Sequence, residues 1–206
     1  MIKVFFDLTD CTVPPEKLQK EIGNAESVLA VTRINPQIEG FLADTLSNPL
    51  LIGGARTILL RAPGYEGLIC RVRERFGSAA EAFLYYQGIE VGVEYAKNHL
   101  EIANKLGIAD PQKIFEDISL SMLNCMGMGK AEVIKHETNP LYIRIRIYNS
   151  FECETGRGAK QPYSQLLRGV IAGILTELYK TKMTVKEQRC ITTGDPYCEF
   201  EAKPEE

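Results

Sequence analysis

The segment 141–148, LYIRIRIY, constrains the fold more than any other stretch of this 206-residue chain. Aliphatic side chains alternate strictly with tyrosines and arginines along it. Such alternation is typical of a strand that buries one face and leaves the other in water, as in antiparallel sheets. Residues 131–137 are joined to it by the turn sequence TNP and are its expected hairpin partner. The sequence therefore predicts an antiparallel sheet with one wet face.

Helical segments flank this hairpin on both sides. Apolar residues recur at helical spacing over residues 78–105, and Asp110 and Pro111 are favourable N-cap and first residues for another helix. A third long helix is expected over residues 162–179, and two further strands within residues 183–202 close the chain. This order predicts an α+β domain, in which helices pack on one face of an antiparallel sheet.

The first 60 residues have a different character. Residues 2–8 and 27–34 are strand candidates, and a short helix is expected after Pro14. We therefore expect a small N-terminal α/β extension over residues 1–60 and a main domain over residues 61–202. Because unpaired apolar strand edges associate readily, we predict a homodimer in which the extension helps to cover the partner.

Composition argues against several functional classes. The net charge of −3 and the lack of a basic stripe predict no nucleic-acid partner. No run approaches the roughly 18 apolar residues of a membrane span, and the N-terminus does not resemble a secretory signal, so we expect a cytoplasmic protein without a membrane segment. No glycine-rich dinucleotide fingerprint follows a strand, so no nucleotide cofactor is expected. His99 and His136 lack a nearby Ser or Cys partner, which favours a protein that is not an enzyme.

Two of the expected helices each carry glycines four residues apart: Gly88, Gly92, Gly169 and Gly173. Each glycine costs a helix about 1 kcal/mol relative to alanine, so the four need a reason. Close helix packing is one explanation, and room for a ligand between the helices and the sheet is a second, compatible one. In the second case Tyr85, Tyr86 and Phe151 are expected to line an apolar cavity together with the glycines.

Two cysteines bracket the turn sequence TGDP near the C-terminus. Cys190 and Cys198 are equally distant from Gly194, so a hairpin centred there would oppose their side chains. Cys198 shares a strand face with Phe200 and is expected to point inward. Strict alternation would place Glu187 and Cys190 on opposite sides of their strand. A β-bulge between them would bring both to the same side.

The same stretch offers ligands for a metal. Structural zinc takes four ligands, and Glu187, Cys190 and Cys198 supply three of them. Cys153 is the best fourth candidate, because it continues the strand parity of Ile147 and should face the same interior. The spacing E-x2-C-x7-C is equally compatible with buried free thiols or with a disulfide, so the residues alone leave these three alternatives open.

At the family level, the motif E-x2-C-x4-GD-x2-C-x-F resembles the closing signature of the vinyl-4-reductase (4-vinyl reductase) domain family. The segments LYYQGIEVG and NSFECE resemble that family's glycine-bearing helix and mid-domain strand, so the resemblance covers about residues 60–202. It implies an α+β fold, usually dimeric, that is shared distantly with subunits of vesicle-tethering particles. It also implies a binding module for small, mostly hydrophobic molecules.

The resemblance implies a metal site as well. In a related sensor domain of phenol-responsive bacterial activators, zinc is held by one glutamate and three cysteines. Three of these ligands correspond to Glu187, Cys190 and Cys198. The third cysteine lies at the start of the preceding helix, where this chain has Ser164. This difference leaves two alternatives: either Cys153 substitutes for the third cysteine, or the site holds no metal.

The function expected from these observations is non-enzymatic binding or sensing of a small hydrophobic molecule by a homodimer. No helix-turn-helix is recognisable, so a sensor of this kind would need a separate output protein. Two alternatives stay open. One is an enzyme or accessory factor in tetrapyrrole vinyl reduction, which the family name suggests. The other is an interaction scaffold like the vesicle-tethering subunits.

Overall fold

A computed structural model describes residues 4–36 and 38–205 of the chain. The chain separates into two compact units, which divide between Leu50 and Leu51. The predicted functional division into residues 1–60 and 61–202 stays a prediction.

The N-terminal unit contains the helix α1, Pro15–Gly23, which confirms the helix predicted there. The prediction of two strands in this unit is wrong for the described residues, because residues 4–8 and 27–34 have no regular secondary structure. Residues 2 and 3 of the first predicted strand lie outside the described part of the chain. Among the described residues of this unit, Ile38 and Phe41 form an isolated β-bridge. None of its described residues is buried, so neither apolar run has a core or a sheet to join.

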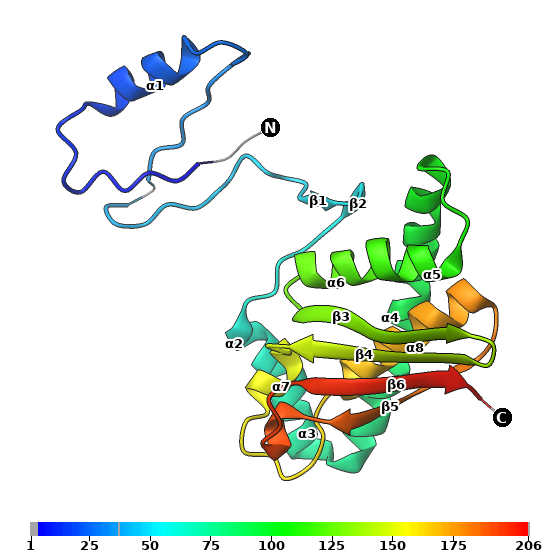
Figure 1. Ribbon diagram of the computed structural model, residues 1–206. Helices are drawn as coiled ribbons and strands as arrows, with labels where there is room; N and C mark the ends of the chain where they lie inside the picture. The colour runs from blue at the N-terminus through cyan, green and yellow to red at the C-terminus, as the bar shows by residue number, and fades with distance from the viewer. Residues whose placement is uncertain (1–3, 37, 206) are drawn as a thin grey trace. The chain divides into compact units, whose positions relative to one another are not determined.

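The second unit is built on a four-stranded antiparallel sheet, which confirms the predicted α+β fold (Figure 1). Its strands follow the spatial order β3, β4, β6, β5. Their bounds are Lys130–Thr138 for β3, Leu141–Tyr148 for β4, Met183–Arg189 for β5 and Cys198–Pro204 for β6. The isoleucines of β4 are fully buried and its tyrosines and arginines are partly exposed, as the alternation predicts. A short hairpin, β1 (Leu51–Ile52) and β2 (Ala55–Arg56), precedes this domain.

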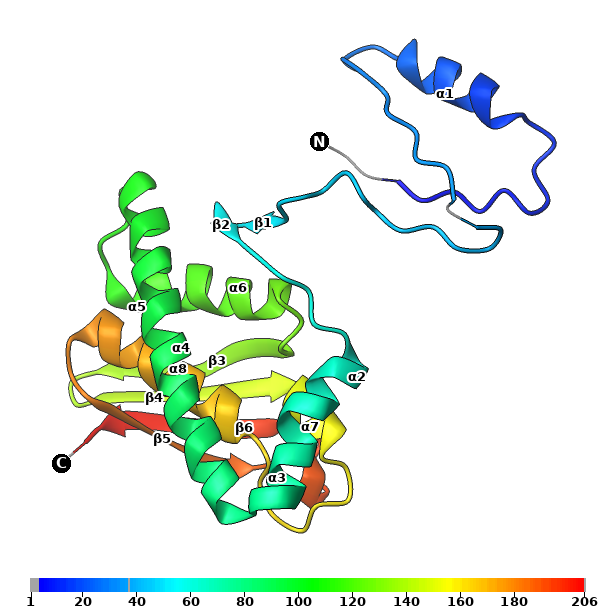
Figure 2. The ribbon, with the colours of Figure 1, turned by 180° about the vertical axis from the view of Figure 1, so that it is seen from behind.

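Two long helices cover the buried face of the sheet. Figure 2 shows α8, Gln165–Tyr179, against the sheet and α4, Ser78–Lys105, crossing it on the outside. Because α8 has neighbours on both sides, nine of its residues are buried, and they form the centre of the main core with β4, β5 and β6.

Shorter helical segments complete the layer, and two of them contain a π-helical turn. The first runs through α2, η1 and α3, with bounds Ala62–Tyr65, Glu66–Cys70 and Arg71–Phe76. The second runs through α5, η2 and α6, with bounds Pro111–Lys113, Ile114–Ser119 and Leu120–Cys125. Asp110 caps the second segment, as predicted, by accepting a hydrogen bond from Gln112 N at 3.1 Å.

The predicted continuation of β4 as a strand through Cys153 is wrong, because Phe151–Thr155 form the short helix α7. The neighbouring strand β6 pairs with β4 only as far as Ile147, so the sheet offers no partner beyond it. Asn149 then takes a left-handed conformation, with φ of 51°, and turns the chain out of the sheet.

The four helix glycines lie where α4 and α8 cross. A Cβ atom added at Gly88 would lie 2.3 Å from the carbonyl oxygen of Leu166, and one added at Gly173 would lie 2.1 Å from that of Ile89. Equivalent contacts occur at Gly92 and Gly169. Glycine allows this close approach because it has no Cβ. Close packing of α4 against α8 therefore explains all four glycines.

Among the described residues, no helix combines the length and the hydrophobicity needed to cross a membrane.

Candidate metal centre

The predicted β-bulge is present in β5. Glu187 pairs with Phe200 and Arg189 pairs with Glu199, so Gln188 is an extra residue in β5. A bulge of this kind shifts the following side chains by one position. It turns Glu187 and Cys190 toward the same side of the strand, as the sequence analysis requires for a shared site.

The turn after β5 holds its cysteine in place. Cys190 donates its backbone N–H to Asp195 Oδ2 at 2.9 Å and accepts a hydrogen bond from Asp195 N at 3.2 Å. Between them lies the single 3₁₀ turn η3, Ile191–Thr193, followed by Gly194 with φ of 98°. A left-handed residue at this point favours glycine, which explains the Gly-Asp pair in the motif. The turn thereby brings Cys190 and Cys198 together.

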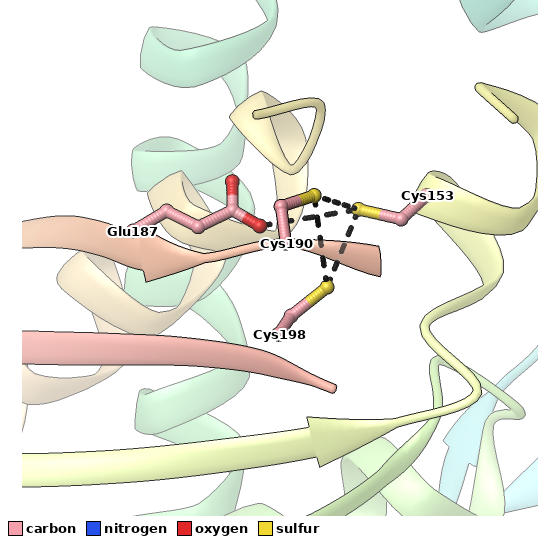
Figure 3. A group of neighbouring side chains, drawn as sticks. All are labelled: Cys153, Glu187, Cys190 and Cys198. Atoms are coloured by element: carbon pink, nitrogen blue, oxygen red, sulfur yellow. Dashed lines mark hydrogen bonds between the residues drawn. The ribbon is translucent and has the colours of Figure 1, made fainter. Parts of the chain in front are cut away.

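Four potential metal ligands converge between α7 and the β5–β6 hairpin (Figure 3). The Sγ atoms are 3.4 Å apart for Cys153 and Cys190, 3.6 Å for Cys153 and Cys198, and 3.9 Å for Cys190 and Cys198. Glu187 Oε1 lies 4.0 Å from Cys153 Sγ. The structure thus brings together all four residues predicted as ligands.

These distances agree with tetrahedral coordination. With Zn–S bonds of about 2.3 Å, tetrahedral angles place two sulfur ligands about 3.8 Å apart. A disulfide would need a separation of about 2.05 Å, and all three cysteines are free thiols. Three sulfurs and one carboxylate oxygen form a complete donor set for zinc, so the residues present fit such an ion.

Burial makes this cluster electrostatically costly without a cation. All three cysteines are fully buried. Burial, together with the neighbouring Cys190, raises the pKa of Glu187 to about 8. The hydrogen bond from Cys153 lowers the pKa of the Cys190 thiol and raises that of Cys153 to about 12. Only part of the cluster can therefore ionise at once, and a bound divalent cation would remove that restriction.

Ser164, just before α8, organises the cluster. Its Oγ donates to Glu187 Oε1 at 2.9 Å and lies 2.8 Å from Cys153 Sγ. Its backbone N–H donates to Glu187 Oε2 at 3.2 Å. Groups that hydrogen-bond to metal ligands fix their orientation. In the sequence, Ser164 stands out only as a residue in the place of an expected cysteine, because its hydrogen bonds depend on distances between separate segments.

A buried ion pair ties the centre to the rest of the helical layer. Glu152, next to Cys153 on α7, accepts a hydrogen bond from Arg73 of α3. The same carboxylate accepts the backbone N–H groups of Leu166 and Leu167 at 3.0 and 2.8 Å, and so caps α8. Both charged side chains are almost fully buried. Sequence reasoning did not single out this pair.

The seven residues predicted to line a ligand cavity lie in three places, and their role in ligand binding stays a prediction. The glycines lie at the helix crossing. Phe151 packs in a separate small cluster with Tyr65, at a ring distance of 4.7 Å, together with Leu84. Tyr85 and Tyr86 instead line a surface hollow at the N-terminal end of α4.

The two histidines lie outside the metal cluster and have polar partners of their own. The expectation that His99 lacks a nearby serine is wrong, because its Nδ1 is 3.0 Å from Ser119 Oγ, a residue twenty positions away in the sequence. His136 lies between Glu116 Oε1 at 2.8 Å and Tyr179 OH at 2.6 Å. Both rings are buried against the core.

Residues 143–204 match the V4R domain, a stretch that contains all four metal-centre residues. This part of the chain is similar to the V4R domain. Over 121 residues it is 31% identical to an uncharacterized protein of Methanocaldococcus jannaschii, and this match covers 58% of the chain and 48% of the relative. The chain therefore spans about half the length of that relative.

Solved structures share the fold. The phenol-responsive sensory domain of the transcription activator PoxR, solved with phenol, superimposes with a TM-score of 0.67 and 18% identity, over 75% of this chain and 79% of that one. A vinyl-4-reductase family protein from Methanocaldococcus jannaschii gives a TM-score of 0.50 and 20% identity, over 73% and 85% of the two chains. The family resemblance seen in the sequence is confirmed, and at these identities the structures support the fold alone.

Proposed function

We propose that the V4R-like domain of this chain is a non-enzymatic binding domain for a small hydrophobic molecule, acts as a homodimer, and is held together by structural zinc. The observation that carries the proposal is the buried cluster of Cys153, Glu187, Cys190 and Cys198. Four protein ligands complete the coordination of zinc and leave no position for a substrate, which is the pattern of structural rather than catalytic sites.

The location of the cluster gives the zinc its role. It joins α7 to the β5–β6 hairpin, two parts of the domain that the sheet alone does not connect. Because the unfolded chain has no preformed site, the free energy of metal binding becomes folding free energy. Removing zinc is therefore expected to loosen α7 and, through Glu152, the start of α8.

Small-molecule binding is supported by the fold that the domain shares with the phenol-bound sensory domain. The homodimer is supported by the N-terminal unit. Its described residues include exposed apolar side chains such as Phe5, Leu29 and Phe41, and none is buried. Apolar side chains without a core need another surface, and a second copy of the chain supplies one.

Native mass spectrometry of the purified full chain tests the three parts together. We expect a dimer that carries two zinc ions and a co-purified organic molecule. A monomer without metal would contradict the proposal. A coloured tetrapyrrole would favour the vinyl-reduction alternative, and a zinc dimer that binds no small molecule would favour the interaction scaffold.

A further inference from the structure

A surface hollow of about 470 Å³ lies where the N-terminal ends of α4 and α8 meet. Ligand pockets in proteins usually have volumes of about 300 to 1,000 Å³, so it can hold a molecule with one ring. The side chains that line it come from α4, from the loop before α8 and from α8: Ser78, Glu81, Ala82, Tyr85, Tyr86, Gln161, Pro162, Gln165 and Arg168.

Arg168 is the unusual residue in this wall. Its Nε atom is shielded from solvent and has no hydrogen-bond partner among the described residues. Its Cζ atom lies 4.5 Å from the centre of the Tyr85 ring, a cation–π contact. Two other arginines of this domain, the buried Arg73 and the partly exposed Arg146, each pair with a glutamate, whereas Arg144 Nε, like Arg168 Nε, has no partner among the described residues. A guanidinium with a shielded Nε and no paired carboxylate is electrostatically complementary to an anion.

Three other polar side chains around the hollow, Glu81, Gln161 and Gln165, are already engaged. Glu81 Oε1 accepts a hydrogen bond from Gln161 Nε2 at 2.6 Å. Gln165 donates to Pro162 O at 3.0 Å, and its Oε1 accepts a hydrogen bond from Arg73. Of the two charged side chains that line the hollow, Glu81 is thus held by an amide and Arg168 is free to pair with a ligand.

The aromatic side chains define the rest of the wall. The rings of Tyr85 and Tyr86 meet edge to face, with their centroids 5.6 Å apart. The Arg168 guanidinium lies over the Tyr85 ring, so the cation and the aromatic wall are next to each other. The hollow therefore combines an aromatic wall, one cation and, at Glu81, one anion.

We propose that this hollow binds a small aromatic monocarboxylate, whose carboxylate pairs with Arg168 and whose ring lies against Tyr85 and Tyr86. Glu81 disfavours a second acidic group on the ligand, because like charges repel across a short distance. The inference rests on the proposed small-molecule function and specifies its ligand class and its site.

Titration of the zinc-loaded full chain with benzoate, and with benzyl alcohol as a neutral ligand of similar size, tests the proposal. Binding is followed by NMR chemical-shift changes of the protein. We expect benzoate to shift the resonances of Arg168 and Tyr85, and Arg168→Gln to weaken benzoate binding at least about tenfold, the size of one lost charged hydrogen bond. Arg157→Gln, at an exposed arginine outside the hollow, should bind benzoate like the unmodified chain.

A second variant keeps the proposal testable if Arg168→Gln does not fold. Glu81→Gln removes the negative charge of the hollow and should strengthen benzoate binding about two- to threefold, consistent with one partly exposed charge. Equal benzoate affinity in the unmodified chain and Arg168→Gln would overturn the assignment. Benzyl alcohol binding in the hollow more tightly than benzoate would also overturn it while leaving the proposed function intact. Binding of neither probe would overturn the site, whereas the proposed function is judged separately by the organic molecule found in native mass spectrometry.

Discussion

The crossing of α4 and α8 makes a quantitative prediction about Gly88. In Gly88→Ala the new Cβ would lie 2.3 Å from the carbonyl oxygen of Leu166 and 2.9 Å from Gly169 Cα. Carbon and oxygen atoms normally approach to about 3.3 Å, so roughly 1 Å must be gained by moving one helix. The contacting atoms belong to the backbone, and no side-chain rotation can relieve the contact.

The cost follows from two opposing terms. Overpacking a tight core typically costs about 1–3 kcal/mol, and the better helix propensity of alanine returns up to about 1 kcal/mol. We therefore expect Gly88→Ala to lower the free energy of unfolding by about 2 kcal/mol. For a chain of this size that corresponds to a melting temperature roughly 4–8 °C lower.

Urea unfolding followed by circular dichroism measures this loss, at a fixed zinc concentration. Gly67→Ala is the matched control, because a Cβ added at Gly67, in the π-helical turn η1, meets no atom within 4 Å. It should be neutral or slightly stabilising. If Gly88→Ala proved as stable as Gly67→Ala, the helices would not pack as closely as described and the explanation of the glycines would be wrong.

Three further predictions concern charged and sulfur-bearing groups. Cys153→Ser should abolish stoichiometric zinc binding in a competition assay with a chromogenic chelator, whereas Cys125→Ser, at an exposed thiol, should not. Glu152→Gln should cost about 3–5 kcal/mol in urea unfolding by leaving Arg73 buried without its anion, and adding Arg73→Met should recover part of that loss; no recovery would contradict the ion pair. Burial lowers the pKa of His99 from 6.5 to about 4, so the unfolded chain binds the extra proton between these values. Stability should therefore fall as pH drops from 6.5 toward 4, by up to about 3 kcal/mol, and His99→Gln should flatten this part of the pH profile.

Much of the main domain follows from local patterns in the sequence. The alternation in 141–148 predicted β4 and its buried face, and the parity of Glu187 against Cys190 required the bulge that the structure contains. These two predictions succeed because strand alternation and turn chemistry are short-range effects. The strands predicted before residue 50 failed, because a strand also needs a partner and the pattern of residues 4–8 does not specify one.

The sequence predicted the four residues of the metal centre, but it predicted their geometry only in part. Cys153 does reach the cluster, but from the helix α7, because Asn149 ends the strand on which the parity argument relied. The roles of Ser164 and Arg168 were not predicted at all. Both depend on distances between segments far apart in the chain, and a single sequence does not encode these in any local pattern.

X-ray absorption at the zinc K-edge of the purified full chain tests the central claim most directly, since it reports the atoms bound to the ion. The account predicts about one zinc per chain, with three sulfur ligands at about 2.3 Å and one oxygen ligand at about 2.0–2.2 Å. Cys153→Ser should leave the site without stoichiometric zinc. A chain purified without metal that binds no added zinc, or a zinc shell of nitrogen and oxygen atoms alone, would contradict it.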